Sequence, residues 1–311
     1  MDISIVIPAY NEELNVEPLS NKLKNVLNTI TSKYEIIWVD DGSKDSTFAN
    51  LEKLNKKDKK IKVIKFKRNF GKASALAAGF EQAKGNLVIT MDADMQDDPE
   101  EIPAMINKLN LGYDLVVGWK YPRKDPFSKI FFSRIFNFLV RKLTNVTVHD
   151  SDCNFRVMKN EVAKDLSKTI YGGLFRYIPS LANWKGYKVT EMKVIHHPRK
   201  FGEAKFSGSG RLIRGFLDLI TIKFLISFEK SPAYFFGKFG LGLLGLGFLS
   251  GLYLLFVKYW LKQIIGNRPL LLLTVLLLVL GVQFIFFGLL GEMITHSNQK
   301  KETGYKISKV L

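Results

Sequence analysis

The chain has 311 residues, 47% of them hydrophobic, so it can bury the core of one large domain or two smaller ones and is not a disordered segment. Its formal net charge of +17 at pH 7 indicates an anionic partner or surface, and no nucleic-acid-binding motif is present. The single cysteine, Cys153, excludes an intrachain disulfide and fits a reducing compartment.

Short apolar runs alternate with amphipathic stretches in the first 118 residues. Strands are predicted at residues 3–7, 34–39, 61–66, 86–91 and 113–118, with helices near Val16–Ile30, Thr47–Leu54 and Lys72–Ala83. This order predicts an α/β fold with a mainly parallel sheet and helices on both faces. The chain starts in the first strand without a charged-then-apolar leader, so no signal peptide is expected.

Polar segments follow four of the predicted strands, which is where ligands bind in such sheets. In chain order the segments read "PAYNEE", "DDGSKDST", "KRNFGK" and "DADMQDD". The first contains no glycine, so a dinucleotide-binding loop of the G-x-G-x-x-G type is not expected. A different phosphate-containing ligand remains compatible with these loops.

The fourth of these segments opens a cluster of six acidic residues within ten positions, from Asp92 to Glu101. Asp98 and Pro99 are typical of the start of a helix, which is predicted to run to Leu109. No such structural role is evident for Asp92, Asp94, Gln96 and Asp97. Neighbouring carboxylates repel each other unless a cation lies between them. The segment is therefore either an exposed acidic turn or a site for a metal ion shared with a phosphate ligand.

Two uncharged apolar runs lie near the C-terminus: Phe239–Val257 with 19 residues and Pro269–Gly291 with 23. Each is long enough to cross a bilayer as a helix. Only residues 258–268 separate them, so a helical hairpin with both flanks on one side is predicted. Those flanks carry eleven Lys and Arg residues and the connecting loop carries three, which predicts a cytoplasmic N-terminal part.

Seven sequence segments together resemble family 2 glycosyltransferases with the A-type nucleotide-sugar fold (GT-A). "PAYNEE", "VDDGSKDST" and "DADMQDDPEEIP" are similar to motifs of the wider family. "DSDCNFRVM", "IPSLAN", "HHPRKFGEAKF" and "GVQFIFFGLLGE" are similar to polyprenyl-phosphate glycosyltransferases, which include undecaprenyl-phosphate glucosyl and aminoarabinosyl transferases and dolichol-phosphate mannose synthase. The resemblance extends from Ile3 to about Glu292. The Q-x-x-R-W segment of processive polysaccharide synthases is not found.

The resemblance implies a division of the chain into a GT-A catalytic domain (1–208), a juxtamembrane amphipathic segment (209–231), two transmembrane helices within 232–295 (about 234–258 and 269–293) and a cytoplasmic tail (296–311). It implies that a nucleotide sugar is bound by Pro8, Ala9, Tyr10, Glu12, Val39, Asp41, Asp92 and Ala93. A divalent cation, Mg²⁺ or Mn²⁺, would be held by Asp92, Asp94 and Gln96, whose hard oxygen atoms suit these ions.

The expected acceptor is a lipid phosphate, which explains the excess of basic residues. Its implied contacts are Lys120, Arg123, Lys129, Ser133, Arg134, Arg199 and Lys205. Asp150 takes the place of the family's acceptor-side acid and, with Asp94, is the expected catalytic residue. Asp152 stands where relatives usually have glycine, so the assignment between Asp150 and Asp152 stays open. Ala204 replaces a usual serine.

The expected reaction is an inverting, metal-dependent transfer of one sugar to a polyprenyl phosphate in the membrane. UDP-glucose is the first candidate donor and GDP-mannose the second. The alternatives are transfer to a lipid-linked saccharide and a non-catalytic, membrane-tethered nucleotide-sugar-binding protein. The expected partners are the nucleotide sugar, the lipid and the membrane, with no nucleic acid, and a homo-oligomer stays open.

Overall fold

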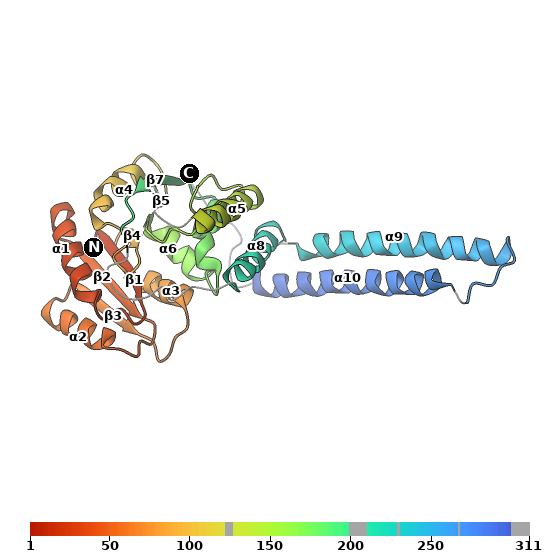
Figure 1. The fold of residues 1–311 in the computed structure, drawn as a ribbon, viewed down its shortest axis with the longest axis horizontal. Coiled ribbons are helices and arrows are strands. Elements are labelled where there is room, and N and C mark those ends of the chain that lie inside the picture. Colours follow the sequence, from red (N-terminus) through yellow and green to blue (C-terminus); the bar gives the residue numbers. More distant parts are fainter. Residues whose placement is uncertain (122–126, 199–209, 229–230, 267, 300–311) are drawn as a thin grey trace. The chain divides into compact units, whose positions relative to one another are not determined.

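The structure is a computed structural model that describes residues 1–121, 127–198, 210–228, 231–266 and 268–299. The chain divides into two compact units, Met1–Lys223 and Phe224–Leu311. The first unit contains one seven-stranded sheet with the strand order β3-β2-β1-β4-β6-β5-β7 (Figure 1). The second contains a hairpin of two long helices.

All five predicted strands are present, and the sheet is mainly parallel. The strands are β1 (Ile3–Ala9), β2 (Tyr34–Asp40), β3 (Ile61–Lys65), β4 (Leu87–Thr90), β5 (Leu115–Lys120), β6 (Arg156–Lys159) and β7 (Val189–Val194). Only β6 pairs antiparallel, with β4 and β5. The sequence analysis missed β6 and β7. β6 has only four residues, and β7 is a half-exposed edge strand with mixed polarity, so neither produces a clear apolar run.

Helices cover both faces of the sheet, as predicted. The helices of the first unit are α1 (Val16–Ile30), α2 (Thr47–Lys57), α3 (Lys72–Gln82), α4 (Ile102–Leu109), α5 (Phe127–Thr144), α6 (Asn160–Ser167) and α7 (Ile178–Trp184), with two short 3-10 helices, η1 (Pro99–Glu101) and η2 (Leu174–Tyr177). α8 (Gly210–Phe228) belongs to this unit up to Lys223. Helices α1, α2 and α4 lie on one side of the sheet, and α3 and α6 on the other (Figure 1).

The parallel register brings the carboxyl ends of the central strands to one edge. Ala9 of β1 is level with Asp40 of β2, which is level with Lys65 of β3. On the other side of β1, Val6 is level with Thr90 of β4. Every residue of β2 is buried, so the polar residues that follow the strands are carried by a rigid apolar core. The predicted polar loops therefore meet at one edge.

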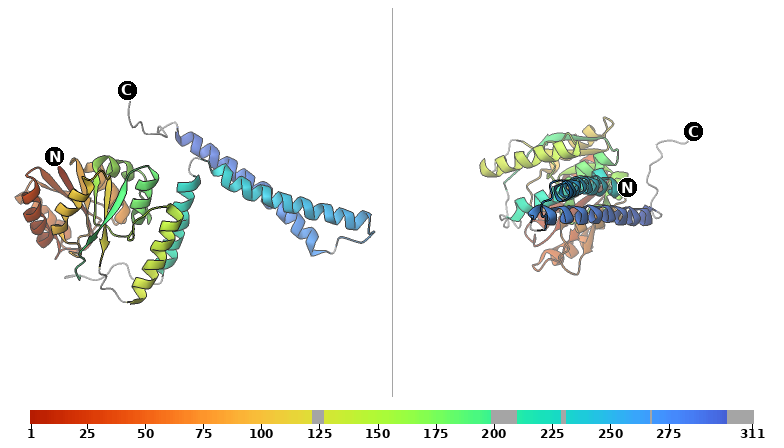
Figure 2. Two further views of the ribbon diagram at one scale, coloured as in Figure 1. Left: turned by 90° about the horizontal axis from the view of Figure 1, so that it is seen from above. Right: turned by 90° about the vertical axis from the view of Figure 1, so that its right-hand side faces the viewer.

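The second unit contains α9 (Pro232–Tyr259) and α10 (Pro269–Gln299), which lie side by side in both views of Figure 2. Both are long and apolar enough to span a membrane, with mean hydropathies of 2.0 and 2.8 over an 18-residue window of each helix. Most of their apolar side chains are exposed, which differs from the buried core helix of a water-soluble protein.

Small residues at seven-residue spacing line the contact between α9 and α10. A Cβ atom added to Gly240 would lie 2.8 Å from the Gly281 carbonyl oxygen, and one added to Gly247 would lie 2.9 Å from Leu278 Cδ2. Seven residues before Gly281 on α10, the Thr274 hydroxyl donates a hydrogen bond to Ser250 Oγ of α9 at 2.9 Å. The helices approach closely because glycine has no side chain, a packing mode common between membrane helices.

Candidate active site

The loops after β1 and β2 are joined by hydrogen bonds between their backbones and side chains. The Asn11 amide donates to Ser43 Oγ at 2.9 Å, and the Lys44 amide donates to Asn11 Oδ1 at 2.8 Å. The Glu12 amide donates to Thr47 Oγ1 at 2.7 Å. Asn11 has φ of 51°, in the left-handed region that asparagine tolerates. The segment predicted to bind the nucleoside, Pro8–Glu12, is thus held in a defined conformation.

Asp41 links the loop after β2 to the loop after β3. Its carboxylate is buried and accepts hydrogen bonds from the backbone amides of Phe70 at 2.7 Å and Gly71 at 2.9 Å. Burial raises the pKa of Asp41, Asp40 raises it further, and these two hydrogen bonds partly oppose the shift. The next residue, Gly42, has φ of 70°, and an added Cβ would lie 2.4 Å from the Arg68 backbone. Only glycine fits there.

Asp40, at the end of β2, has unused hydrogen-bonding capacity. Its Oδ1 accepts from the Ser43 amide at 3.0 Å, but its buried Oδ2 has no hydrogen-bond partner among the described residues. A buried acceptor without a partner costs free energy and is common where a ligand binds.

Asp92 follows β4 and contacts two residues that the sequence analysis did not include in the site. Its Oδ1 lies 2.5 Å from Lys72 Nζ and accepts a hydrogen bond from Asn154 Nδ2 at 2.9 Å. Burial would raise the pKa of Asp92, but Lys72, Lys120 and Asn154 outweigh burial and lower it. Lys72 is the first residue of α3, so its backbone and side chain both place positive charge at this edge.

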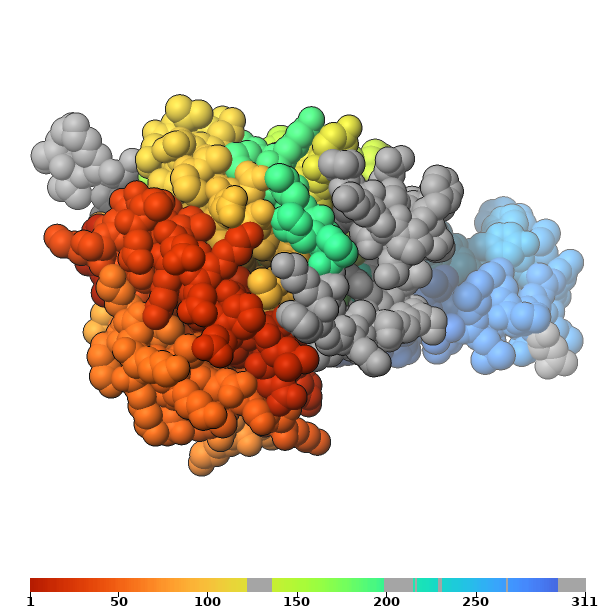
Figure 3. Space-filling view, turned by 60° about the vertical axis from the view of Figure 1, so that its left-hand side comes forward, coloured from red at the N-terminus to blue at the C-terminus, as the bar shows by residue number. Residues whose placement is uncertain are grey.

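The remainder of the acidic loop forms a tight turn. Met95 has φ of 58°, and the Gln96 amide donates to Asp94 Oδ1 at 3.2 Å. Gln96 is also bound to His197 through two hydrogen bonds. The Gln96 side-chain amide donates to the His197 backbone carbonyl at 3.2 Å, and the Gln96 backbone carbonyl accepts from the His197 backbone amide at 2.8 Å. Residues 189–198, coloured green, run beside this loop in Figure 3.

Asp97 is a third carboxylate of this cluster. The sequence indicated no structural role for it, and it is not among the predicted site residues. It is buried, with 3% of its surface exposed. Burial first, and then Asp92 and Asp94, raise its pKa to about 6, although Lys120 opposes the shift. The ionised form of Asp97 is therefore disfavoured by its buried and acidic surroundings.

Asp98 has a structural role at the start of a helix, as predicted, and two histidines contact this part of the loop. Asp98 accepts a hydrogen bond from the Glu100 amide at 3.1 Å and so caps η1. It also binds Lys22 at 2.7 Å and His197 Nε2 at 2.8 Å. Burial opposes ionisation of Asp98, but these contacts prevail and lower its pKa to about 2. His196 forms an isolated strand bridge with Asp97.

Seven residues are predicted to contact the acceptor phosphate, and the structure describes the side chain of one of them, Lys120, the last residue of β5. Burial would lower its pKa, but Cys153, Asp97, Asp150 and Asp92 raise it above its usual value. Lys120 thus interacts both with the acidic loop and with Asp150, the predicted acceptor-side acid.

The other six predicted acceptor contacts have no described side chain. Three of them, Lys129, Ser133 and Arg134, lie in the first part of α5, where only the backbone is described. The other three, Arg123, Arg199 and Lys205, lie outside the described residues.

The loop between α5 and β6 carries Asp150 and is held by a buried arginine. Arg156 has no exposed surface, donates to Asn154 Oδ1 at 3.1 Å and donates to the Ser151 carbonyl at 3.2 Å. Asn154 in turn donates to Asp92, so one chain of hydrogen bonds joins the two halves of the site. Asp150 is 2% exposed, whereas Asp152 is partly exposed and lies 3.5 Å from Arg176.

The predicted metal ligands fit an ion that is shared with a bound ligand. Asp92, Asp94 and Gln96 offer hard oxygen atoms, and a cation near Asp97 would favour its ionised form, because burial and the charges of Asp92 and Asp94 raise the pKa of Asp97. Across the described ranges, no three His, Cys, Asp or Glu side chains are arranged to hold an ion by themselves. A diphosphate would have to supply the missing ligands.

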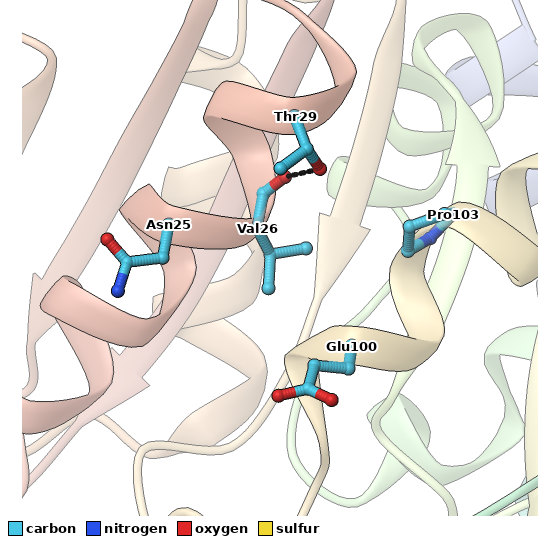
Figure 4. A pocket seen from close by; sticks show the side chains of 5 residues that line it. All are labelled: Asn25, Val26, Thr29, Glu100 and Pro103. Carbon is cyan, nitrogen blue, oxygen red and sulfur yellow. Dashed lines mark hydrogen bonds between the residues drawn. The ribbon is translucent and has the colours of Figure 1, made fainter.

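A surface hollow lies away from this loop. Figure 4 shows it between α1 and the η1–α4 segment, lined by Asn25, Val26, Thr29, Glu100 and Pro103. None of these is a predicted site residue, and the Thr29 hydroxyl is used within its own helix, donating to the Val26 carbonyl at 2.7 Å. A smaller hollow includes Asp97 and His197 and adjoins the acidic loop.

The mainly parallel sheet and the acidic loop after β4 define a glycosyltransferase domain with the GT-A fold. Residues 4–167 match the family described as Glycosyl transferase family 2. The chain belongs to glycosyl transferase family 2, as its motifs predicted.

Two curated relatives match almost the whole chain. Dodecaprenyl-phosphate galacturonate synthase from Rhizobium johnstonii is 36% identical over 302 residues, which cover 96% of this chain and 88% of that protein. Undecaprenyl-phosphate 4-deoxy-4-formamido-L-arabinose transferase from Pseudomonas fluorescens is 34% identical over 312 residues, which cover 99% of this chain and 90% of that protein. These matches include the C-terminal apolar helices.

A solved structure confirms the fold. Glucosyl-3-phosphoglycerate synthase from Mycobacterium tuberculosis, in complex with Mn²⁺, UDP-glucose and phosphoglyceric acid, has a TM-score of 0.56 at 16% identity, covering 74% of this chain and 82% of that chain.

Proposed function

We propose that this protein transfers one sugar from a nucleotide sugar to the phosphate of a membrane polyprenyl phosphate, with inversion at the anomeric carbon. The observation that carries the proposal is the chain of hydrogen bonds from Asp92 through Asn154 to Arg156 and the Ser151 carbonyl, which joins the acidic loop to the loop that carries Asp150. The half-buried Lys120 adds a positive charge that interacts with Asp92, Asp97 and Asp150, which suits a reaction that brings two phosphates together. The printed names of both relatives are those of prenyl-phosphate sugar enzymes.

The proposed reaction forms a bond between a phosphate oxygen of the acceptor and the anomeric carbon of the sugar. The bond from that carbon to the nucleoside diphosphate breaks, and the diphosphate leaves with the electron pair. A phosphate monoester is largely dianionic at pH 7, so no proton has to be removed from the nucleophile. Lys120 would reduce the repulsion between acceptor and donor, and Asp150 would orient the acceptor.

Mg²⁺ or Mn²⁺ is the proposed cofactor, held by Asp92, Asp94 and Gln96. When bound, it would neutralise charge on the leaving diphosphate. The solved structure of glucosyl-3-phosphoglycerate synthase contains Mn²⁺ with UDP-glucose, and another structure of that enzyme, with a TM-score of 0.50, contains Mg²⁺ with UDP.

The donor sugar is open to experiment. UDP-glucose is the first candidate and GDP-mannose the second, while the names of the relatives add galacturonate and 4-deoxy-4-formamido-arabinose. Purified full-length protein would be incubated with labelled nucleotide forms of these sugars and polyprenyl phosphate. We expect label in the organic phase with one of them. Label that appears only on a lipid-linked saccharide, or with none of the donors, would contradict the proposal.

The proposed topology places the catalytic unit in the cytoplasm and α9 and α10 across the membrane. The Lys and Arg distribution around the two helices supports this orientation. Reporters near Gly85 and after Leu311 are expected to report cytoplasm, and one near Gln263 the opposite side. Protection of the catalytic unit from protease added to the cytoplasmic face would contradict it.

A further inference from the structure

Helix α8 is attached to the catalytic unit at the segment Gly173–Tyr177. Asp218 of α8 packs against Gly173 so closely that an added Cβ on that glycine would lie 1.9 Å from Asp218 Oδ2. The buried Tyr177 hydroxyl donates a hydrogen bond to the Gly215 carbonyl at 2.9 Å. Both contacts come from η2 or the residue before it, so α8 docks on this segment.

Arg176, in the same segment, contacts two carboxylates that come from different parts of the chain. Its Nη1 lies 3.6 Å from Asp218 Oδ2 on α8, and its Nε lies 3.5 Å from Asp152 Oδ1 in the loop before β6. Only 15% of the Arg176 side chain is exposed, so these ion pairs are partly shielded from water. A planar guanidinium can bind two carboxylates through different nitrogen atoms, which an ammonium group cannot do in the same way.

The loop that Arg176 contacts carries Asp150, two residues before Asp152. Arg156 holds the same loop from the interior through the Ser151 carbonyl. One arginine therefore holds this loop to the sheet and the other joins it to α8. The ring centroid of Phe175, next to Arg176, lies 5.4 Å from Lys72 Nζ. Lys72 in turn binds Asp92 on the donor side.

We propose that Arg176 is a positioning residue that joins α8 to the loop Asp150–Asp152, so that the placement of α8 sets the position of the acceptor-side carboxylate. The inference rests on the proposed function, because it assigns Asp150 to the acceptor side. α8 leads in sequence toward α9, the first apolar helix. The same role accounts for Asp152, which departs from the family pattern, because Arg176 is its ion-pair partner.

The test compares full-length wild type with Arg176→Ala, Arg176→Lys, Asp218→Asn and the double variant Arg176→Ala/Asp218→Asn, all in lipid nanodiscs. Asp58→Asn is the matched control, because Asp58 is a similarly exposed carboxylate that binds Lys24 at 2.7 Å beside β3. Hydrogen exchange of the amides in 150–154 is measured first, since it does not depend on activity. We expect faster exchange there in Asp218→Asn and Arg176→Ala but not in the control.

Kinetics then separate positioning from general destabilisation. Turnover with polyprenyl phosphate is expected to fall about tenfold in Arg176→Ala and Asp218→Asn, with the KM for the nucleotide sugar unchanged and Arg176→Lys intermediate. The double variant is expected to be no worse than Arg176→Ala. Unchanged exchange in 150–154, or losses that add in the double variant, would overturn the inference. An inactive wild type with the expected exchange pattern would refute the proposed function alone.

Discussion

The two edges of the sheet both bury carboxylates, but they use them differently. At the amino edge, Glu35 has no exposed surface and accepts hydrogen bonds from Ser4 Oγ at 2.6 Å and the Lys84 amide at 2.7 Å, and it is paired with Lys62. Burial opposes its ionisation, but these partners prevail and lower its pKa. This carboxylate is fully used by the fold.

At the carboxyl edge, Asp92 and Asp98 are likewise paired and have lowered pKa values, but two other carboxylates have the opposite balance. The pKa of Asp97 is raised to about 6 by burial and by its acidic neighbours, and Asp40 Oδ2 is buried without a hydrogen-bond partner among the described residues. The contrast indicates that a satisfied buried carboxylate stabilises the fold, whereas a crowded one is available to a ligand. Four predictions test that distinction, and the largest effect comes first.

Asp94→Asn is expected to lower transfer by about a hundredfold or more, because it removes half of the carboxylate pair proposed to hold the cation. The thermal unfolding midpoint in detergent should stay near that of wild type. Glu35→Gln is the matched control, since it changes a buried carboxylate at the other edge. Full activity of Asp94→Asn, or of the wild type in excess chelator, would remove the metal from the proposal.

Lys72→Met is expected to lower transfer about ten- to a hundredfold, because a charge-assisted contact to Asp92 at the reacting edge is lost. Lys62→Met, which removes the lysine paired with Glu35, should leave transfer unchanged. Initial rates at saturating donor and acceptor measure both. Equal losses in the two variants would mean that the edges do not differ in function.

Glu35→Gln is expected to destabilise the catalytic unit by about 1–3 kcal/mol, because a buried charge-assisted hydrogen bond is lost. Transfer per folded molecule should not change. Denaturant unfolding and rates normalised to folded protein provide the two measurements. A specific loss of transfer without a loss of stability would contradict the structural role of this edge.

The smallest expected effect is on the pH dependence of stability. Since the pKa of Glu35 is lowered in the folded protein, its stabilising contribution is present above its unfolded pKa of about 4.3 and is lost as pH falls through the folded value. Unfolding of wild type and Glu35→Gln is compared at pH 7 and at about pH 3.5. The difference between them should shrink at the lower pH, and a constant difference would exclude this linkage.

The contrast between the two edges was only partly visible in the sequence. Alternating strands and helices predicted the parallel sheet, and α1 has the predicted bounds, because its buried Leu19, Leu23 and Leu27 follow helical spacing. The acidic loop stood out by charge alone. Glu35, by contrast, stands in an apolar strand and gave no sign of its partners, which come from residues 4, 62 and 84.

Local pattern thus determined the α/β class, the two apolar helices and the candidate residues Asp92 and Asp94, because apolar periodicity and clustered charge are properties of neighbouring residues. Asp150 was a candidate only through the resemblance to the family. Only the tertiary structure brought Lys72, Asn154 and Arg156 to Asp92 and its neighbours, and joined Arg176 to both Asp152 and Asp218. Such pairings depend on strand order and on the antiparallel insertion of β6, which link residues far apart in the chain. A lysine, asparagine or arginine looks the same in sequence whether it faces water or a buried carboxylate, and only its folded surroundings decide which.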